Sequence, residues 1–184
     1  MKLILTRHGK TDENIAGIIM GQLPGKLSEA AISGTEELRD KIKNIKLDVI
    51  YSSDLKRCVD TATILKGNSN VRIILEPGLR ETHFGKYQGK PYSLVKGDYV
   101  SNLQKKFPGG ESNTDLIRRV IDTINNIYQH NKNKTVLIVT HSGPISVINA
   151  ALFNRTFAEE IQNKATHNDI QVIHIRKNLV YPNT

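Results

Sequence analysis

The chain has 184 residues, 38% of them hydrophobic, and a formal net charge of +8 at pH 7. This length suits one domain with a substantial apolar core and disfavours a second large one. No apolar run approaches the roughly 20 residues of a membrane-spanning helix, and the lysines are scattered rather than gathered in a basic run, so membrane-spanning and nucleic-acid-binding proteins are both disfavoured.

Five short apolar runs predict β-strands: Leu3–Leu5, Asp48–Tyr51, Val71–Leu75, Val136–Thr140 and Ile170–Ile175. Longer segments with helical periodicity separate these runs, and the alternation predicts an α/β domain. The run Val136–Val139 has no polar alternation, which predicts a central parallel strand covered on both faces.

Three segments predict amphipathic helices, because their apolar residues recur near a 3.6-residue period. Their apolar faces carry, in chain order, Leu27, Ala31, Leu38, Ile42 and Ile45, then Leu55, Val59, Ala62 and Leu65, then Leu116, Val120, Ile124 and Ile127. Gly34 is expected to be a tolerated glycine inside the first helix. Ser53 or Asp54 is expected to cap the second helix.

Residues 76–111 break this alternation, because prolines and glycines punctuate short polar and aromatic pieces. We expect a loop-rich excursion from a single domain spanning residues 1–184 rather than a linker between two domains. Long loops inside compact domains are often functional, so the excursion is expected to form part of the binding site.

Polar residues follow the first predicted strand directly, beginning with Arg7, His8 and Gly9. Ligands of open α/β sheets bind beyond the carboxyl ends of the strands. A guanidinium suits phosphate oxygens, an imidazole can act as a nucleophile, and a glycine lets a ligand approach the backbone. Thr11 and Asn14 add neutral hydrogen-bond donors. Taken alone, the triplet favours a buried structural histidine.

Two further strand ends repeat this arrangement. The second strand leads into a helix that is expected to begin near Asp54, which places Arg57 in its first turn and off the apolar face. The run Val136–Val139 leads to His141 at another helix start, where Pro144 suits the first turn. Taken alone, Arg57 favours a surface role. Together, three strand ends supply two arginines and two histidines.

Longer motifs extend over nearly the whole chain: Leu5–Asn14, Tyr51–Arg57 with Thr61 and Ala62, Leu79–Gly85, Pro108–Ser112 and Val139–Gly143. In content and order they resemble the histidine phosphatase superfamily, in its phosphoglycerate mutase-like branch. Five such motifs together are highly specific. The resemblance implies a three-layer α/β/α sandwich around a mostly parallel central sheet.

The resemblance also implies five catalytic residues. His8 would be the nucleophile that becomes phosphohistidine, and Arg7, Arg57 and His141 would bind the phosphoryl oxygens. Glu81 would protonate the departing alcohol and then take a proton from the attacking water; outside its motif it would be a surface loop glutamate. Positive donors suit this chemistry, because a loose phosphoryl-transfer transition state carries charge on three equatorial oxygens.

Five more residues are implied to line the substrate site: Asn14, Gln22, Thr11, His83 and Ser142. His83 is expected either to bind substrate or only to shape the pocket. The remaining histidines match no motif and are expected to be structural or surface residues: His130, His167 and His174.

Some positions depart from the family pattern. Lys10 stands where relatives usually carry Glu or Gln, Pro24 and Lys26 replace the usual Asp and Pro of the following loop, and Ser142 replaces a frequent glycine. These changes leave the core chemistry intact, but the identity of the substrate cannot be inferred from that of relatives.

The expected function is metal-independent hydrolysis of a small phosphorylated metabolite through a phosphohistidine. A cofactor-dependent phosphoglycerate mutase is the first alternative, because it shares these catalytic residues. Such mutases carry a longer, more basic insertion after the acid, whereas only Thr82–Pro108 is available here. An α-ribazole-phosphate phosphatase-like enzyme is a further alternative that the sequence does not separate from a broad-specificity phosphatase.

Two other classes stay open. His8, His83, His141 and Glu81 could gather around a divalent metal, although no His-x-x-x-His pair supports this. A non-catalytic phosphate-binding module is disfavoured, because a nucleophile, phosphate-binding residues and an acid are all present. We therefore expect neither a metal nor another cofactor.

The cellular setting is expected to be cytoplasmic. Cys58 is the only cysteine and cannot form an internal disulfide, and the first residues lack the flank and cleavage site of a signal peptide. The expected partner is a small phosphorylated substrate, which the positive charge would attract. The sequence does not indicate an oligomeric state.

Overall fold

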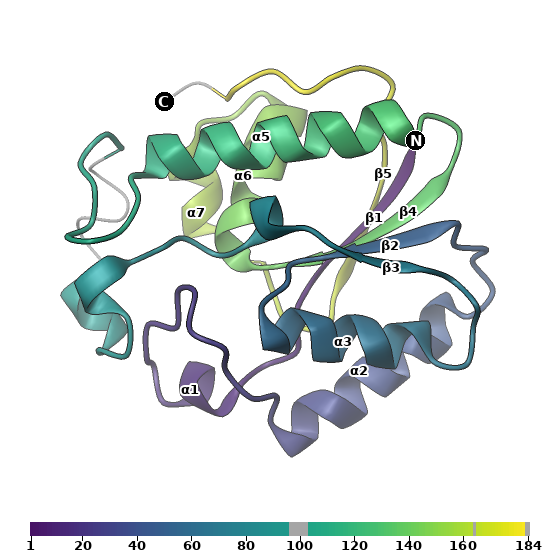
Figure 1. Cartoon of the computed structure of the whole chain (residues 1–184), viewed down its shortest axis with the longest axis horizontal. Coiled ribbons are helices and arrows are strands. Elements are labelled where there is room, and N and C mark those ends of the chain that lie inside the picture. Colours follow the sequence, from purple (N-terminus) through teal and green to yellow (C-terminus); the bar gives the residue numbers. More distant parts are fainter. Residues whose placement is uncertain (96–102, 164, 183–184) are drawn as a thin grey trace.

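The computed structural model describes residues 1–95, 103–163 and 165–182 (Figure 1). Its centre is a five-stranded sheet in the order β3-β2-β4-β1-β5. The strands are β1 (Lys2–Arg7), β2 (Val49–Ser52), β3 (Ile73–Leu75), β4 (Thr135–Thr140) and β5 (Ile170–His174). Only β5 runs antiparallel, paired with β1 at the edge. The predicted mostly parallel sheet is confirmed.

Alternating side chains divide the interior into two cores, one on each face of the sheet. Leu3 and Leu5 of β1 face the first core, whereas Ile4 faces the second. The helices are α1 (Asp12–Ile15), α2 (Glu29–Ile42), α3 (Lys56–Lys66), α5 (Asn113–His130), α6 (Ser142–Phe153) and α7 (Phe157–Gln162). Figure 1 shows α5, α6 and α7 on one face and α2 and α3 on the other, which confirms the three-layer sandwich.

Short side chains fix where several helices begin. Ser28 accepts a hydrogen bond from the backbone of α2, while Ser112 and Thr156 form reciprocal capping boxes at α5 and α7. The one-turn α1 and the six-residue α7 are too short to show a periodic pattern, and the sequence did not predict them. Within the described ranges, none of the helices has both the length and the apolar character needed to cross a bilayer.

The start of α3 differs from the prediction. The helix begins at Lys56, with Leu55 at the N-cap position and no side-chain cap. Ser53 is not the cap, because its hydroxyl accepts a hydrogen bond from the Leu55 backbone before the helix starts, and the Asp54 carboxylate is bound by an arginine. Arg57 still lies in the first turn, but it is 1% exposed rather than a surface residue.

The predicted third strand is also shorter than expected. It begins at Ile73 rather than Val71, and its three residues pair with Ile50–Ser52 of β2. Its N-terminal neighbour Arg72 still accepts a hydrogen bond from the Ile50 backbone.

The described part of the 76–111 excursion contains three 3₁₀ turns, η1 (Pro77–Leu79), η2 (Gly85–Tyr87) and η3 (Tyr92–Leu94). Residues 96–102 of this predicted excursion lie outside the described residues.

Arg119 of α5 ties the excursion to the rest of the fold. Its guanidinium donates to the backbone carbonyls of Gly78, Arg80 and Glu81 at 3.0, 2.8 and 3.1 Å. It also pairs with the Glu111 carboxylate at 2.6 Å. One half-buried side chain thus holds both ends of the excursion.

Two backbone segments of the excursion also meet directly at Gly85. This glycine has a φ of +54°, and a Cβ added there would lie 2.1 Å from the Pro108 carbonyl oxygen. Only glycine permits this approach, because any side chain would meet backbone rather than a movable side chain.

We therefore expect Gly85→Ala to lower the free energy of unfolding by more than about 2 kcal/mol, since a backbone clash adds to the ~1 kcal/mol cost of a left-handed conformation. Gly17→Ala is the matched control, because Gly17 has a φ of +71° and open space around its Cβ position. Urea unfolding of the two variants measures the difference. Equal losses of unfolding free energy in the two variants would contradict the close contact between the Gly85 and Pro108 backbones.

Candidate active site

His8 follows β1 and is 2% exposed. Its Nδ1 lies 2.7 Å from the Gly9 carbonyl oxygen. Because a carbonyl only accepts, Nδ1 carries the proton and Nε2 keeps its lone pair. The Arg57 Nε donates to this Nε2 at 3.2 Å. The ring thus has one fixed tautomer, with its nucleophilic nitrogen facing a guanidinium.

The charge state of His8 follows from the same surroundings. Burial lowers the pKa of the imidazole well below its usual value, and the charges of Arg57 and Arg7 lower the pKa further. The ring is therefore neutral near pH 7, which is the form in which Nε2 can attack.

Arg57 is held by the loop that follows α1. Its Nη2 donates to the Gly21 carbonyl at 2.6 Å, and its Nη1 donates to the Leu23 carbonyl. Burial lowers the pKa of the guanidinium, while the negative charges of Glu81 and Glu13 act in the opposite direction. The side chain is a buried, oriented cation beside His8.

His141 occupies the N-cap position of α6. Its ring centroid lies 5.0 Å from that of His8, edge to face. Its Nε2 lies 2.9 Å from the Ser53 hydroxyl and 3.3 Å from the Cys58 thiol. Burial lowers the pKa of His141 well below its usual value, followed by the charge of Arg57. A second neutral imidazole therefore adjoins the first.

Arg7 comes from the last position of β1. Its Nη1 donates to the Ala165 carbonyl at 2.9 Å, and its charge lowers the pKa values of both His8 and His141. Arg7, His8, Arg57 and His141 therefore lie within one electrostatic neighbourhood at the carboxyl ends of the strands, as predicted.

Glu81 reaches this neighbourhood from the excursion. Its Oε1 accepts hydrogen bonds from the backbone N–H groups of Thr82 at 2.9 Å and Gly143 at 3.2 Å. Gly143 belongs to the first turn of α6, whose N-terminus favours a negative charge. The side chain is half-buried, and it is bound to the first turn of α6, which His141 precedes as the N-cap residue.

The predicted substrate-binding residues separate into two groups. Gln22 donates from its side chain to the Glu81 carbonyl at 3.2 Å, and the Ser142 hydroxyl is buried without a hydrogen-bond partner within the described residues. Thr11 and Asn14 bond to each other in the capping box of α1. His83 is held through its backbone N–H, which donates to the Glu111 carboxylate. Only the first group is tied to Glu81 or His141.

His167 was not assigned to the site from sequence, yet it lies against His8. Its Nδ1 is 2.9 Å from the His8 carbonyl oxygen, and the two rings are 5.4 Å apart. The other two unmatched histidines, His130 and His174, are exposed. His167 precedes β5, the strand that pairs with β1, and this pairing places it beside the end of β1.

The metal alternative was tested on the same geometry. Over residues 1–95, 103–163 and 165–182, no group of three His, Cys, Asp or Glu side chains is arranged to hold a metal ion. The residues proposed for that site, such as His8 and His141, instead contact arginine, thiol and hydroxyl groups.

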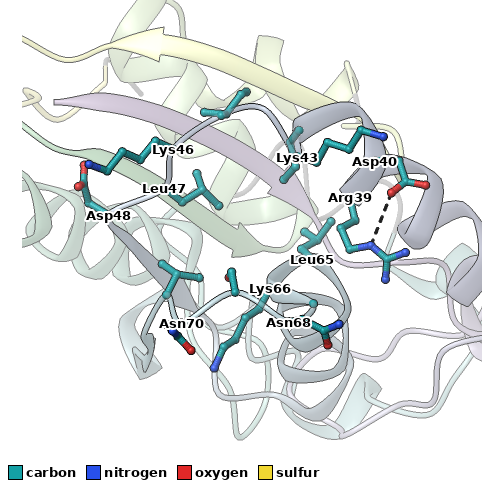
Figure 2. A pocket seen from close by; sticks show the side chains of 15 residues that line it. Arg39, Asp40, Lys43, Lys46, Leu47, Asp48, Leu65, Lys66, Asn68 and Asn70 are labelled. Atoms are coloured by element: carbon teal, nitrogen blue, oxygen red, sulfur yellow. Dashed lines mark ion pairs between the residues drawn. The ribbon is translucent and has the colours of Figure 1, made fainter.

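A cavity of about 830 Å³ lies at the opposite end of the parallel strands (Figure 2). It is bordered by the C-terminal ends of α2 and α3 and by the segments that enter β2 and β3. Lys43, Lys46 and Lys66 surround an apolar floor that includes Leu47 and Leu65. None of the predicted site residues lines this cavity.

The whole chain was compared with known proteins. The model of the histidine phosphatase superfamily (branch 1) matches residues 3–180. The chain belongs to the histidine phosphatase superfamily. It is therefore a phosphatase, as predicted.

Relatives of this phosphatase include proteins with named substrates. It is 30% identical to a metal-independent phosphoserine phosphatase of Arabidopsis thaliana, over 95% of this chain and 76% of the relative. It is 28% identical to phosphoserine phosphatase 1 of Hydrogenobacter thermophilus, over 98% of this chain and 90% of the relative.

A solved structure extends the similarity to the fold. The crystal structure of a mutant phosphoserine phosphatase from Entamoeba histolytica in complex with phosphoserine matches with a TM-score of 0.82 and 26% identity. The match covers 98% of this chain and 94% of that chain.

The neutral state of His8 predicts a pH dependence of stability. Because the pKa is depressed in the folded state, the unfolded chain binds the proton more readily below about pH 6.5, so stability is lost as the pH falls. His8→Ala should reduce the slope of unfolding free energy between pH 6 and 5 by about 1 kcal/mol per pH unit. Urea unfolding across this range measures the slope, with exposed His130→Ala as the control. An unchanged slope in His8→Ala would contradict a neutral His8.

Proposed function

We propose that this phosphatase hydrolyses small phosphomonoesters through a phosphohistidine formed on Nε2 of His8. The observation that carries the proposal is the hydrogen bond from Nδ1–H of His8 to the Gly9 carbonyl, because it leaves the lone pair on Nε2. Burial and two arginines keep the ring neutral, so the lone pair is available near pH 7.

In the first step, Nε2 of His8 attacks phosphorus while the bond from phosphorus to the alcohol oxygen breaks. Protonated Glu81 gives its proton to that departing oxygen. Arg7 and Arg57 bind the equatorial phosphoryl oxygens, with His141 beside them. Fixed positive donors are the main contribution that a protein can make to such a loose transition state.

In the second step, water attacks the phosphorus of the phosphohistidine. The Glu81 carboxylate, now deprotonated, takes a proton from this water, and the phosphorus–nitrogen bond breaks. Inorganic phosphate leaves, and His8 returns to its neutral form. The Gly143 N–H donates to the Glu81 side chain and thereby orients it.

We propose O-phosphoserine, a small phosphorylated acid, as the first substrate to test. The support comes from relatives named as phosphoserine phosphatases and from a similar structure in complex with phosphoserine. The side chains proposed to contact the part of the substrate beyond its phosphate are Gln22, whose amide donates to the Glu81 carbonyl, and Ser142, which follows His141 in the chain. No metal takes part in this proposal.

His8→Ala should reduce phosphoserine hydrolysis by at least about 10⁴-fold, because the nucleophile is lost. Wild-type enzyme that is quenched during turnover in the presence of a chelator should carry acid-labile phosphate on His8, detected by mass spectrometry of the peptide. His130→Ala serves as the matched histidine control and should behave like wild type.

Two outcomes would contradict this mechanism: activity in His8→Ala, or activity that disappears with chelator and returns with metal. 3-Phosphoglycerate and an α-ribazole phosphate are assayed in parallel. Formation of 2-phosphoglycerate without release of phosphate would identify a mutase, and a strong preference for the α-ribazole ester would replace phosphoserine as the substrate.

Glu81→Gln should slow the hydrolysis of esters with poor leaving groups more than that of esters with good leaving groups. Glutamine retains an acceptor for the Gly143 N–H but cannot donate a proton as a general acid. Hydrolysis of phosphoserine should fall by about 100-fold or more, whereas p-nitrophenyl phosphate, whose leaving group needs little protonation, should lose less than about 10-fold. Steady-state kinetics on both esters test this. Equal losses would exclude Glu81 as the acid.

A further inference from the structure

The segment 165–169 enters β5 and crosses the carboxyl end of β1, where the proposed nucleophile lies. Three consecutive residues at the end of β1 contact it, two through their side chains and one through its backbone carbonyl. Thr6 donates from its hydroxyl to the Asp169 carbonyl at 2.7 Å, and Arg7 donates to the Ala165 carbonyl at 2.9 Å. The third contact is the one between His167 and His8.

Helix α2 supports this segment from its other side. The Thr35 hydroxyl donates to the Ala31 carbonyl at 2.6 Å, and its oxygen lies 3.3 Å from the side-chain oxygen of Asn168, which has a φ of +57°. A Cβ added at Gly34 would lie 2.4 Å from the Asn168 amide nitrogen. Gly34, expected to be merely a tolerated helix glycine, therefore makes room for this contact. The segment is anchored independently of His167.

His167 binds the main chain of His8 rather than its ring nitrogens. The Nδ1 of His167 faces a carbonyl oxygen, so it carries the proton and donates at 2.9 Å. The His8 backbone N–H donates in turn to the Thr140 carbonyl at 2.9 Å. With the ring bound to Gly9 and Arg57, every polar atom of His8 has a partner.

The surroundings of His167 keep it from acting as another cation. Burial lowers the pKa of His167 to about 4, and the charges of Arg7 and Lys10 act in the same direction. The neutral ring also contacts the His8 ring edge to face, with centroids 5.4 Å apart and an angle of 64° between the planes. Its contribution is therefore orientation rather than charge.

We propose that His167 is a positioning residue for His8: its Nδ1–H holds the His8 carbonyl, and thereby the main-chain torsions from which the imidazole projects toward the phosphoryl group. This inference rests on the proposed role of His8 as the nucleophile. Without the donor, the His8 carbonyl loses its partner and the His8–Gly9 peptide is held only through its N–H, which donates to the Thr61 hydroxyl. A tilt of the peptide about that remaining bond would misplace Nε2. Errors of this kind in the placement of a reacting group lower the rate of the chemical step.

The test compares His167→Asn with His167→Leu. The two side chains have nearly the same shape, but only asparagine can donate to the His8 carbonyl. His167→Phe is the third variant, because it keeps an aromatic ring against His8 without the donor. Rapid-quench experiments with p-nitrophenyl phosphate measure the rate constant of phosphohistidine formation, steady-state kinetics give kcat and KM, and thermal unfolding reports stability.

We expect the leucine and phenylalanine variants to form phosphohistidine about 10- to 100-fold more slowly, with KM changed less than about 3-fold. The asparagine variant should recover most of the rate. Three results would overturn the proposal: equal rates in the asparagine and leucine variants, recovery by phenylalanine alone, or wild-type rates in all three with only lower stability. If one of the variants without the donor does not fold, the other gives the same comparison with asparagine.

The wild-type measurement separates this inference from the function on which it rests. If wild-type enzyme forms no phosphohistidine on His8, the proposed mechanism fails. If wild-type enzyme forms phosphohistidine and the leucine variant forms it equally fast, only the role of His167 fails.

Discussion

The hydrogen bond between the His8 ring and the Gly9 carbonyl decides which imidazole nitrogen carries the lone pair, and both helices on that face of the sheet contact Gly9. The Gly9 N–H donates to the Thr61 hydroxyl of α3 at 3.0 Å. On the side of α2, a Cβ added at Gly9 would lie 3.1 Å from the Thr35 hydroxyl oxygen. The peptide that joins His8 to Gly9 is therefore held at its N–H by Thr61 and at its carbonyl by His167, and this places the Gly9 carbonyl that selects the tautomer.

The charges around the site leave a cationic Arg57 beside a neutral His8, the proposed nucleophile. Arg57 donates to backbone carbonyls and to His8, and such neutral partners leave its full positive charge for a phosphate dianion. Nearby carboxylates have arginine partners of their own, Arg80 for Asp54 and Arg119 for Glu111. The cation beside His8 is consequently not cancelled by these acids.

Cys58 touches the same site but is poorly suited to chemistry. Burial strongly raises the pKa of its thiol, so the reactive thiolate is disfavoured. Its sulfur contacts the carbonyl of Thr140, the last residue of β4, and the ring of His141, the N-cap residue of α6. The contact helps to fill the space beneath the histidine.

The sequence predicted those parts of the site that follow from strand order. An apolar run that ends in a polar residue marks a strand end, and this rule found His8 and His141 before the fold was known. The α/β class of the fold followed from the alternation of predicted strands and helices. The start of α3 was missed, because the side chains expected to cap it have other partners and Leu55 provides only its backbone.

His167 was missed for a topological reason. It lies 159 residues from His8 and belongs to no motif, so no local spacing connects the two. The available signal was the pairing of β5 with β1, because an antiparallel strand begins where its neighbour ends. Local patterns do not reveal that pairing, and Ile170–Ile175 alone does not specify which strand it joins or in which direction.

The contacts of Arg119 have a consequence for how substrate binding is driven. Since the Arg119 guanidinium binds the carbonyls of Arg80 and Glu81 together with the Glu111 carboxylate, the loop that carries Glu81, the proposed acid, is ordered when α5 packs on the sheet. Its conformational entropy is lost during folding, before any ligand arrives. Binding of a phosphate ester then need not order this loop, so the entropic cost of placing Glu81 does not reduce the free energy of binding.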